Sequence, residues 1–135
     1  MSDSVNPWNI PFSRTSFLQK ILLNHDNVEN LRREKDILFL FDRKQQGDQI
    51  RLLGGDEYTF SLALVMRALQ DFGPLQYICV GGSWNGYSAQ AKDYCRQNHI
   101  GLYNSTELAG GIWATQYWDY AKKDKDGNRY YSTKS

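Results

Sequence analysis

Two stretches of this chain combine residue types that could bind a ligand. The first, Gly81-Gly82-Ser83-Trp84-Asn85-Gly86, follows an apolar run and precedes a helical pattern. Small residues at such a junction leave open the backbone amides that begin a helix, and these amides bind anions well. We therefore expect Gly82 and Ser83 to contact a phosphate or another anion. The stretch lacks both the three-glycine dinucleotide spacing and a Gly-Lys-Ser sequence, which argues against a nucleotide cofactor.

The second stretch is an aromatic tail at 112–135, in which rings alternate with charged residues. Its rings could stack on bases while its cations contact phosphates. The same rings could instead pack on the domain or on a partner subunit, and a formal net charge of only +1 favours packing. The nucleic-acid-binding candidates in this tail are Trp118, Lys122, Lys123, Lys125 and Arg129.

Other reactive side chains lack neighbours at metal-ligand spacing. His25 and His99 have no carboxylate or cysteine at a recognised spacing, so they are assigned to a loop and a helix end. Cys79 and Cys95 fall in an apolar run and on a helical segment, which predicts buried free thiols. Asp124-Lys125-Asp126-Gly127 lacks the further acidic positions of a calcium loop and is expected to form a hairpin tip.

The apolar pattern predicts the elements that position these stretches. It indicates a helix from Ser13 or Thr15 to Leu31, with a break at 24–27. The later elements expected, in chain order, are a buried strand at 37–41 after Asp36, a turn at 45–48, a paired strand at 49–53, a helix at 58–72, a strand at 75–80, a helix at 87–98 and a strand at 100–103. This order of strands and helices favours parallel pairing with crossover helices, and hence an α/β fold.

The composition agrees with one folded domain. Of the 135 residues, 41% are hydrophobic and 23% are charged, so a single core is expected. No apolar run reaches the roughly 18 residues of a membrane span, and no basic and then apolar leader opens the chain, so we expect a cytoplasmic protein without a membrane partner. We divide the domain into an extended arm at 1–13, held by Trp8 and Phe12, a core at 14–108 and the tail at 112–135.

The segment from Val80 to Ile100, with Leu102 and Leu108, resembles the second half of Mrr-type restriction-endonuclease-like domains of the PD-(D/E)xK superfamily. In that family a strand ends in a small-residue turn, and an aromatic-Ser pair, here Tyr87-Ser88, begins a helix with small residues four apart. Ala91 and Cys95 occupy those small positions and would let the helix lie close to the sheet. The resemblance implies a three-layer core of helix, β-hairpin, helix, strand, helix and strand, followed here by an aromatic hairpin.

The resemblance also implies a Mg²⁺-dependent nuclease site. Asp36 stands at the family's acidic position, where it would be the metal ligand, and Gln49-Ile50-Arg51 stands at the Gln-x-Lys position of the partner strand. Arg51 replaces the lysine, and a bulky guanidinium does not reproduce a compact ammonium beside a metal-bound water. We therefore expect a catalytically degenerate module.

Such a module would act in nucleic-acid-associated binding or assembly, as a subunit of a larger complex with a protein partner or with further copies of itself. The first alternative is an active Mg²⁺-dependent nuclease with an atypical site of Asp36, Gln49 and Arg51. The second is a protein-interaction subunit that makes no contact with nucleic acid.

Overall fold

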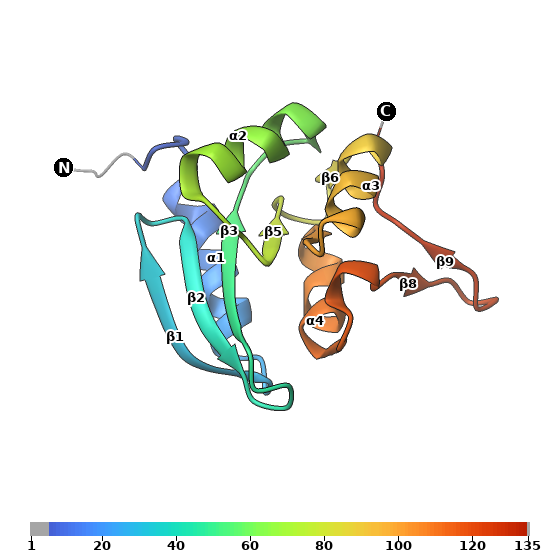
Figure 1. The fold of residues 1–135 in the computed structure, drawn as a ribbon, viewed down its shortest axis with the longest axis horizontal. Coiled ribbons are helices and arrows are strands. Elements are labelled where there is room, and N and C mark those ends of the chain that lie inside the picture. Colours follow the sequence, from blue (N-terminus) through green and yellow to red (C-terminus); the bar gives the residue numbers. More distant parts are fainter. Residues whose placement is uncertain (1–5, 135) are drawn as a thin grey trace.

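A mixed five-stranded sheet with the order β1-β2-β3-β5-β7 organises the described residues, 6–134, of this computed structural model (Figure 1). Its strands are β1 (Val28–Glu34), β2 (Leu38–Arg43), β3 (Gln49–Gly54), β5 (Tyr77–Cys79) and β7 (Gly101–Tyr103). The first three pair antiparallel, whereas β3, β5 and β7 run parallel. The protein therefore has the mixed α/β fold that the sequence predicts.

Helices cover both faces of this sheet. The helices are α1 (Phe12–Leu23), α2 (Leu62–Phe72), α3 (Ala89–Gln97) and α4 (Ser105–Trp113). One buried cluster joins α2 and α3 to one face of the sheet, and a second joins α1 and α4 to the other. Neighbouring residues of β2 divide between the two clusters, Leu38 in the first and Phe39 in the second, because side chains alternate along a strand.

Shorter elements complete the fold. They are β4 (Thr59–Phe60) parallel to β6 (Gly86–Tyr87), the 3-10 turn Tyr117–Asp119, and β8 (Lys122–Lys123) antiparallel to β9 (Arg129–Tyr130). The β8–β9 hairpin projects away from the rest of the domain in Figure 1. Its turn contains Gly127 with a φ of 83°, so the predicted hairpin tip is confirmed.

The helix starts follow from local polar residues. Ser61 and Ser88 each accept a hydrogen bond from the backbone N–H three residues later, which caps α2 and α3. Asn104 and Glu107 form a reciprocal capping box at the start of α4. Ala91 and Cys95 of α3 are fully buried in one cluster with strand residue Ile78, as expected for small residues that face the sheet.

The largest departure from the predicted elements is β1. The helix expected to reach Leu31 ends at Leu23, and an antiparallel edge strand replaces its second half. An irregularity between Glu29 and Arg32 adds a residue to this strand, so Val28 and Leu31, three apart, both pack against the α1 and α4 cluster. A bulged strand therefore reproduces the spacing that would otherwise indicate a helix.

Smaller departures occur at the ends of the predicted core. The helix expected at 87–98 begins two residues later, because Gly86–Tyr87 is a strand, and α4 was not expected.

Trp8 packs near Phe60 and Phe72, as predicted for the arm. Phe12 instead begins α1 and is largely exposed, so it does not hold the arm, and residues 1–5 of the arm lie outside the described residues. Both cysteines are buried and free.

No helix among residues 6–134 is long and apolar enough to cross a membrane.

Candidate functional site

The carboxyl ends of the three parallel strands meet at a crease beside α1. Gly54 and Gly55 end β3, Gly81 and Gly82 follow β5, and Ser105 follows β7. In open α/β sheets, ligands bind outside the carboxyl ends of the strands. This crease is therefore the first place to look for a site, and it contains one of the two anion-site residues predicted from the sequence, Gly82.

Glycines and asparagines shape the crease. A Cβ on Gly54 would lie 2.7 Å from a methyl carbon of Leu18, so a larger residue here would force the Leu18 side chain of α1 to move. Asn85 then holds the loop that follows β5, because its Oδ1 accepts a hydrogen bond from the Gly82 N–H at 3.1 Å. Its Nδ2 donates to the carbonyl of Glu57, which ties this loop to the segment after β3. The crease is thus held by fixed loops.

A cation lines the crease, and the loop after β5 carries an exposed indole. The Arg14 side chain is half exposed, and its Nη1 passes 3.6 Å from where a Gly82 Cβ would be. Its Nε lies 3.3 Å from a carboxylate oxygen of Asp56. Two residues after Gly82, Trp84 is 81% exposed, which is rare for a side chain this large and apolar. Ser83 between them is exposed.

The crease is shallow. It encloses only about 20 Å³, little more than the space of one water. Pockets that enclose small molecules have volumes of about 300–1,000 Å³. A ligand at this site would therefore lie across the surface, with an anionic group near Arg14 and Gly82 and a planar group on the ring of Trp84.

The predicted catalytic residues do not converge. Gln49 is paired with Asp42, whereas Asp36 lies in the turn before β2, at the other end of the hairpin. Six residues of strand separate Asp36 from Asp42, which corresponds to about 20 Å. The expectation that Asp36 and Gln49 share a site is therefore wrong, because the hairpin register places them at opposite ends.

Arg51 and Gln49 instead lie at a groove on the α2 side of the sheet, together with Arg32 and Gln76. The Nη1 of Arg51 donates to the carbonyls of Phe72 and Pro74, so this guanidinium holds the end of α2. Two residues apart on β3, Arg51 and Gln49 share a face, as alternation predicts. Arg51 and Gln49 therefore lie beside the end of α2, far from Asp36.

The residues present do not fit the Mg²⁺ site that the resemblance implies. The Gly54 N–H donates to the carbonyl of Ile37, so the start of β2 faces Gly54 and Gly55. The facing positions two residues apart are Leu53 and Gly55, where a carboxylate or amide and a lysine would be needed. Across the part of the chain that the structure describes, no group of three or more His, Cys, Asp or Glu residues is placed to hold a metal ion.

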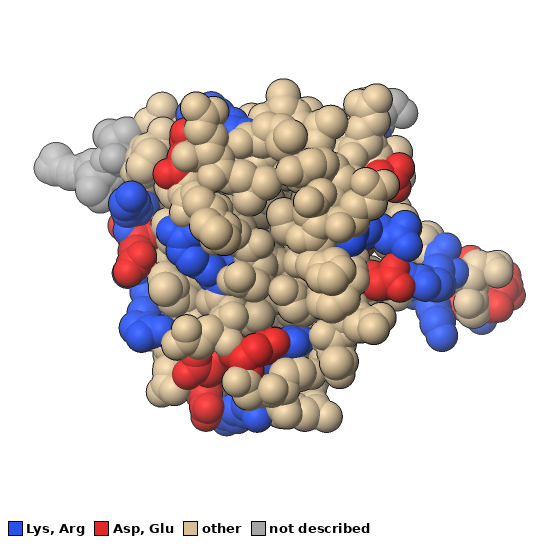
Figure 2. Space-filling model, in the orientation of Figure 1, with Lys and Arg blue, Asp and Glu red and all other residues tan. Residues whose placement is uncertain are grey.

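The tail candidates fall on and near the projecting hairpin. Lys122 and Lys123 form β8, Lys125 is in the turn, and Arg129 on β9 donates to the carbonyl of Asp119. Trp118 stacks on His99 with a ring distance of 4.1 Å, so this face of its ring is already covered. Figure 2 shows charges of both signs along the hairpin, while the centre of the viewed face is largely uncharged.

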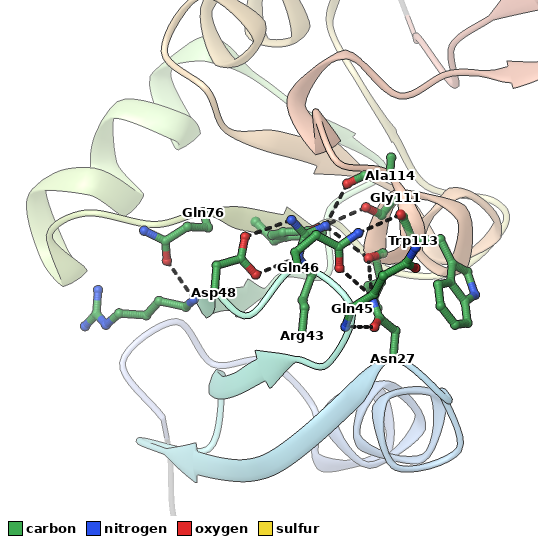
Figure 3. Close-up of polar contacts among 12 residues, drawn as sticks. Asn27, Arg43, Gln45, Gln46, Asp48, Gln76, Gly111, Trp113 and Ala114 are labelled. Atoms are coloured by element: carbon green, nitrogen blue, oxygen red, sulfur yellow. Dashed lines mark hydrogen bonds and ion pairs between the residues drawn. The ribbon is translucent and has the colours of Figure 1, made fainter.

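Sequence reasoning missed a buried cation at the opposite end of the sheet. Arg43 of β2 forms a bidentate ion pair with Asp48 (Figure 3). Its guanidinium also donates hydrogen bonds to the carbonyls of Ile112 and Ala114 and to the hydroxyl of Tyr77. Burial lowers the pKa of Arg43, but the hydrogen bond to Asp48 and the electrostatic interactions with Tyr77, Asp48 and Tyr117 together raise it by more. This network joins the β2–β3 loop to the end of α4. The sequence feature that could have predicted this network is an arginine at the end of an apolar strand, since a charged residue there needs polar partners.

A second buried cation, Lys92 of α3, has few polar partners. Its Nζ donates to the carbonyl of Leu102 at 2.7 Å and lies 4.8–5.0 Å from the ring centres of Tyr87, Tyr103 and Tyr131. Burial lowers the pKa of Lys92 to about 8. Beside it the Tyr87 hydroxyl donates to Glu107. Sequence reasoning missed this cluster too, because a lysine on a helix is usually exposed.

No family model matches this chain, and no curated protein or solved structure resembles it closely enough to count as a match. No relative therefore assigns a ligand to the crease.

Proposed function

We propose that this chain is a restriction-endonuclease-like module that binds nucleic acid without cutting it. The order of α1, the β2–β3 hairpin, α2, β5, α3 and β7 agrees with the order that the Mrr-type resemblance implies. The buried positions of Ala91 and Cys95 also agree with the close helix packing expected from it. These agreements support the family assignment.

The hairpin register supports binding without cleavage. Hydrolysis in this family requires an acidic residue at the start of one hairpin strand and a lysine on the facing strand. Here the facing positions are Leu53, Gly54 and Gly55. Gln49 and Arg51 lie at the far half of β3 and provide no substitute.

Two observations carry the binding proposal: the Arg14 guanidinium lines the crease, and the exposed Trp84 indole lies two residues beyond Gly82 in the loop after β5. Arg14 would contact a phosphate, and the ring of Trp84 would stack on a base, a contact that tolerates any sequence. The shallow shape of the crease suits a strand that lies across it better than a small molecule that must be enclosed. Bases are free to stack only where they are unpaired, so we expect single-stranded nucleic acid to bind best.

Fluorescence anisotropy with labelled single-stranded DNA and RNA tests this proposal. Trp84→Ala should weaken binding by about 5-fold to 150-fold, because one base stack contributes on the order of 1–3 kcal/mol. Arg14→Gln should weaken binding and reduce its salt dependence by about one phosphate contact. Matched controls are Trp113→Ala and Arg32→Gln, which alter an exposed indole and an exposed arginine away from the crease.

Three results would contradict the proposal. One is the absence of binding at low salt, and another is equal binding by all four variants. The third is cleavage with Mg²⁺ or Mn²⁺ that disappears in Asp36→Ala, since it would establish the active-nuclease alternative.

A second candidate function, a protein-interaction subunit, is favoured by exposed apolar side chains on α1. Phe12 and Leu23 lie at the two ends of one side of this helix and are largely exposed, as is half of Phe17 on another side, and exposed apolar surface marks interaction sites. If this surface pairs with another subunit, light scattering should show an assembly in the parent protein. The double variant Phe12→Ser, Leu23→Ser should then be monomeric. A monomeric mass in both proteins at high concentration would eliminate self-association through α1.

A further inference from the structure

Residues 131–134 lie along β6 as an added strand. The Tyr87 N–H donates to the carbonyl of Ser132, and the Lys134 N–H donates to the carbonyl of Tyr87. In addition, the Ser132 N–H donates to the Tyr87 hydroxyl. We call residues 131–134 the strap and the surface beneath it the β6 groove.

The β6 groove is shaped to receive a strand. A Cβ on Gly86 would overlap the Ser132 carbonyl oxygen, so only glycine lets the strap approach. The ring of Tyr131 covers Lys92, with its centre 4.8 Å from Nζ, and the Nζ of Lys134 lies 4.8 Å from the ring centre of Tyr58. Without the strap, Tyr87 would lose its backbone hydrogen bonds to Ser132 and Lys134 on the edge of β6 that faces away from β4, and the buried ammonium would lose one of its three rings. These contacts therefore favour the state in which a strap occupies the β6 groove.

The connection to the strap is weakly attached to the domain. Residues 123–130 are all exposed, and Figure 1 shows their hairpin extending away from the α/β layers. Among the described residues, the hydrogen bonds of 122–130 are internal except for those of Arg129, which reach Asp119 and Tyr131. The strap is thus held in its groove by contacts of its own, at the end of a tether that can straighten.

We propose that the β6 groove accepts the strap of a second copy of this chain, which yields a dimer by strand exchange. Every contact between strap and groove is the same whichever copy contributes the strap. The exchange removes only the internal bonds of the β8–β9 hairpin, and two straightened tethers can pair with each other. Exchange of an identical element through a hinge is a low-cost route to dimers.

Straightening the hairpin should therefore increase dimer formation. Gly127 has a φ of 83°, and a Cβ placed on it would meet no other atom within 4 Å, so Gly127→Val strains the turn without touching the core. The strain is present in the closed monomer and absent from the exchanged dimer. We expect the dimerisation constant to rise by about tenfold or more, measured by light scattering over a concentration series.

Gly47→Val is the matched control. Gly47 has a φ of 72° and is equally unobstructed, but it lies in the β2–β3 turn, which does not lead to the strap. This variant should remain as monomeric as the parent. A dimer of equal strength in both variants, or a monomer in both, would overturn the proposal.

A second substitution identifies the surface that dimerises. In the Gly127→Val protein, Gly86→Ala should remove the dimer, because its methyl group would occupy the place of the Ser132 carbonyl. If Gly86→Ala prevents folding, deleting residues 131–135 from the Gly127→Val protein replaces it as the test, because a chain without a strap has nothing to exchange. A dimer that persists without the strap would show that another surface is responsible.

Discussion

Arg43 and Lys92 are each about 1% exposed, yet their surroundings differ in kind. Arg43 has a carboxylate, a phenol and two carbonyls as hydrogen-bond partners. Lys92 has one carbonyl and three aromatic rings. The pKa of Arg43 is raised from its ordinary value, whereas that of Lys92 is lowered to about 8.

The difference shows that a buried cation stabilises the fold when its donors all find hydrogen-bond acceptors. A planar guanidinium presents five donors in a fixed arrangement, so one Arg43 side chain can join a loop, a strand and a helix end. The compact ammonium of Lys92 loses water without gaining equivalent partners, and rings that attract it replace only part of the hydration. The hydrogen-bond partners of Arg43 therefore all come from the core of the domain. Lys92, in contrast, is covered in part by the ring of Tyr131 in the strap.

The largest effect is expected at Arg43. Replacing Arg43 by Met should lower the free energy of unfolding by about 3–5 kcal/mol, because the charged hydrogen bonds to the carbonyls of Ile112 and Ala114 and the ion pair with half-exposed Asp48 are all lost. Urea unfolding followed by circular dichroism measures this loss. Arg32→Met, on the exposed side of β1, is the control and should change stability by less than about 0.5 kcal/mol. Equal losses in the two variants would remove the distinction between a closed network and a surface charge.

The next effect concerns the pH dependence that Lys92 imposes. Its pKa is about 8 in the folded protein and 10.5 when unperturbed, so between these values the unfolded chain binds more protons. The contribution of Lys92 to stability therefore rises with pH in this window and is constant below it, with a total change of about 3 kcal/mol. Lys92→Met lacks this change, so its difference in stability from the parent should vary by that amount between pH 8 and pH 10.5.

The measurement is the difference in unfolding free energy between the parent and Lys92→Met across this pH range. Burial raises the pKa of both cysteine thiols to about 12, so their titration also contributes above pH 9. The contribution of Cys79 cancels in the difference, but the charge of Lys92 lowers the pKa of Cys95, so the comparison is clearest between pH 8 and pH 9. Lys123→Met, on the exposed hairpin, should show a constant difference from the parent. A pH-independent difference for Lys92→Met as well would mean that the buried ammonium is fully compensated.

The smallest effect tests the ring that completes the Arg43 network. Tyr117 stacks on Tyr77 with a ring distance of 4.6 Å, and the Arg43 guanidinium lies 5.2 Å from its ring centre. Tyr117→Leu keeps an apolar side chain but loses both ring contacts, so we expect a loss of about 1–2 kcal/mol. Tyr130→Leu, an exposed ring of the hairpin, should have almost no effect in the same urea titration. Indistinguishable losses would show that the Tyr117 ring contributes only its buried area.

Local patterns predicted most of the core elements. The hairpin of β2 and β3, α2, β5, α3 and β7 lie within a few residues of their expected positions, because apolar periodicity and turn residues specify each of them locally. The exception is β1, where the spacing of Val28 and Leu31 fits either a helix or a bulged strand. Pairing with β2 decides between these two, and such pairing is not encoded in the segment alone.

The candidate site was predicted only in part. Gly82 and Ser83 were expected to contact an anion because glycines between a strand and a helix are a local signal. Arg14 and Gly54 come to the same crease from distant segments, and no pattern in the sequence links them. The burial of Arg43 and Lys92 likewise depends on neighbours far along the chain, such as Ala114 and Tyr131.

By itself, the sequence determined the α/β class, the turn residues, the buried cysteines and the small face of α3, since each follows from residue types within a few positions of one another. Only the tertiary structure decided which of the polar residues meet. Asp36 and Gln49 were expected together, and the register of one hairpin separates them. A strand pair has many registers that satisfy its local alternation, and packing of both sheet faces selects one, so the site depends on the whole core.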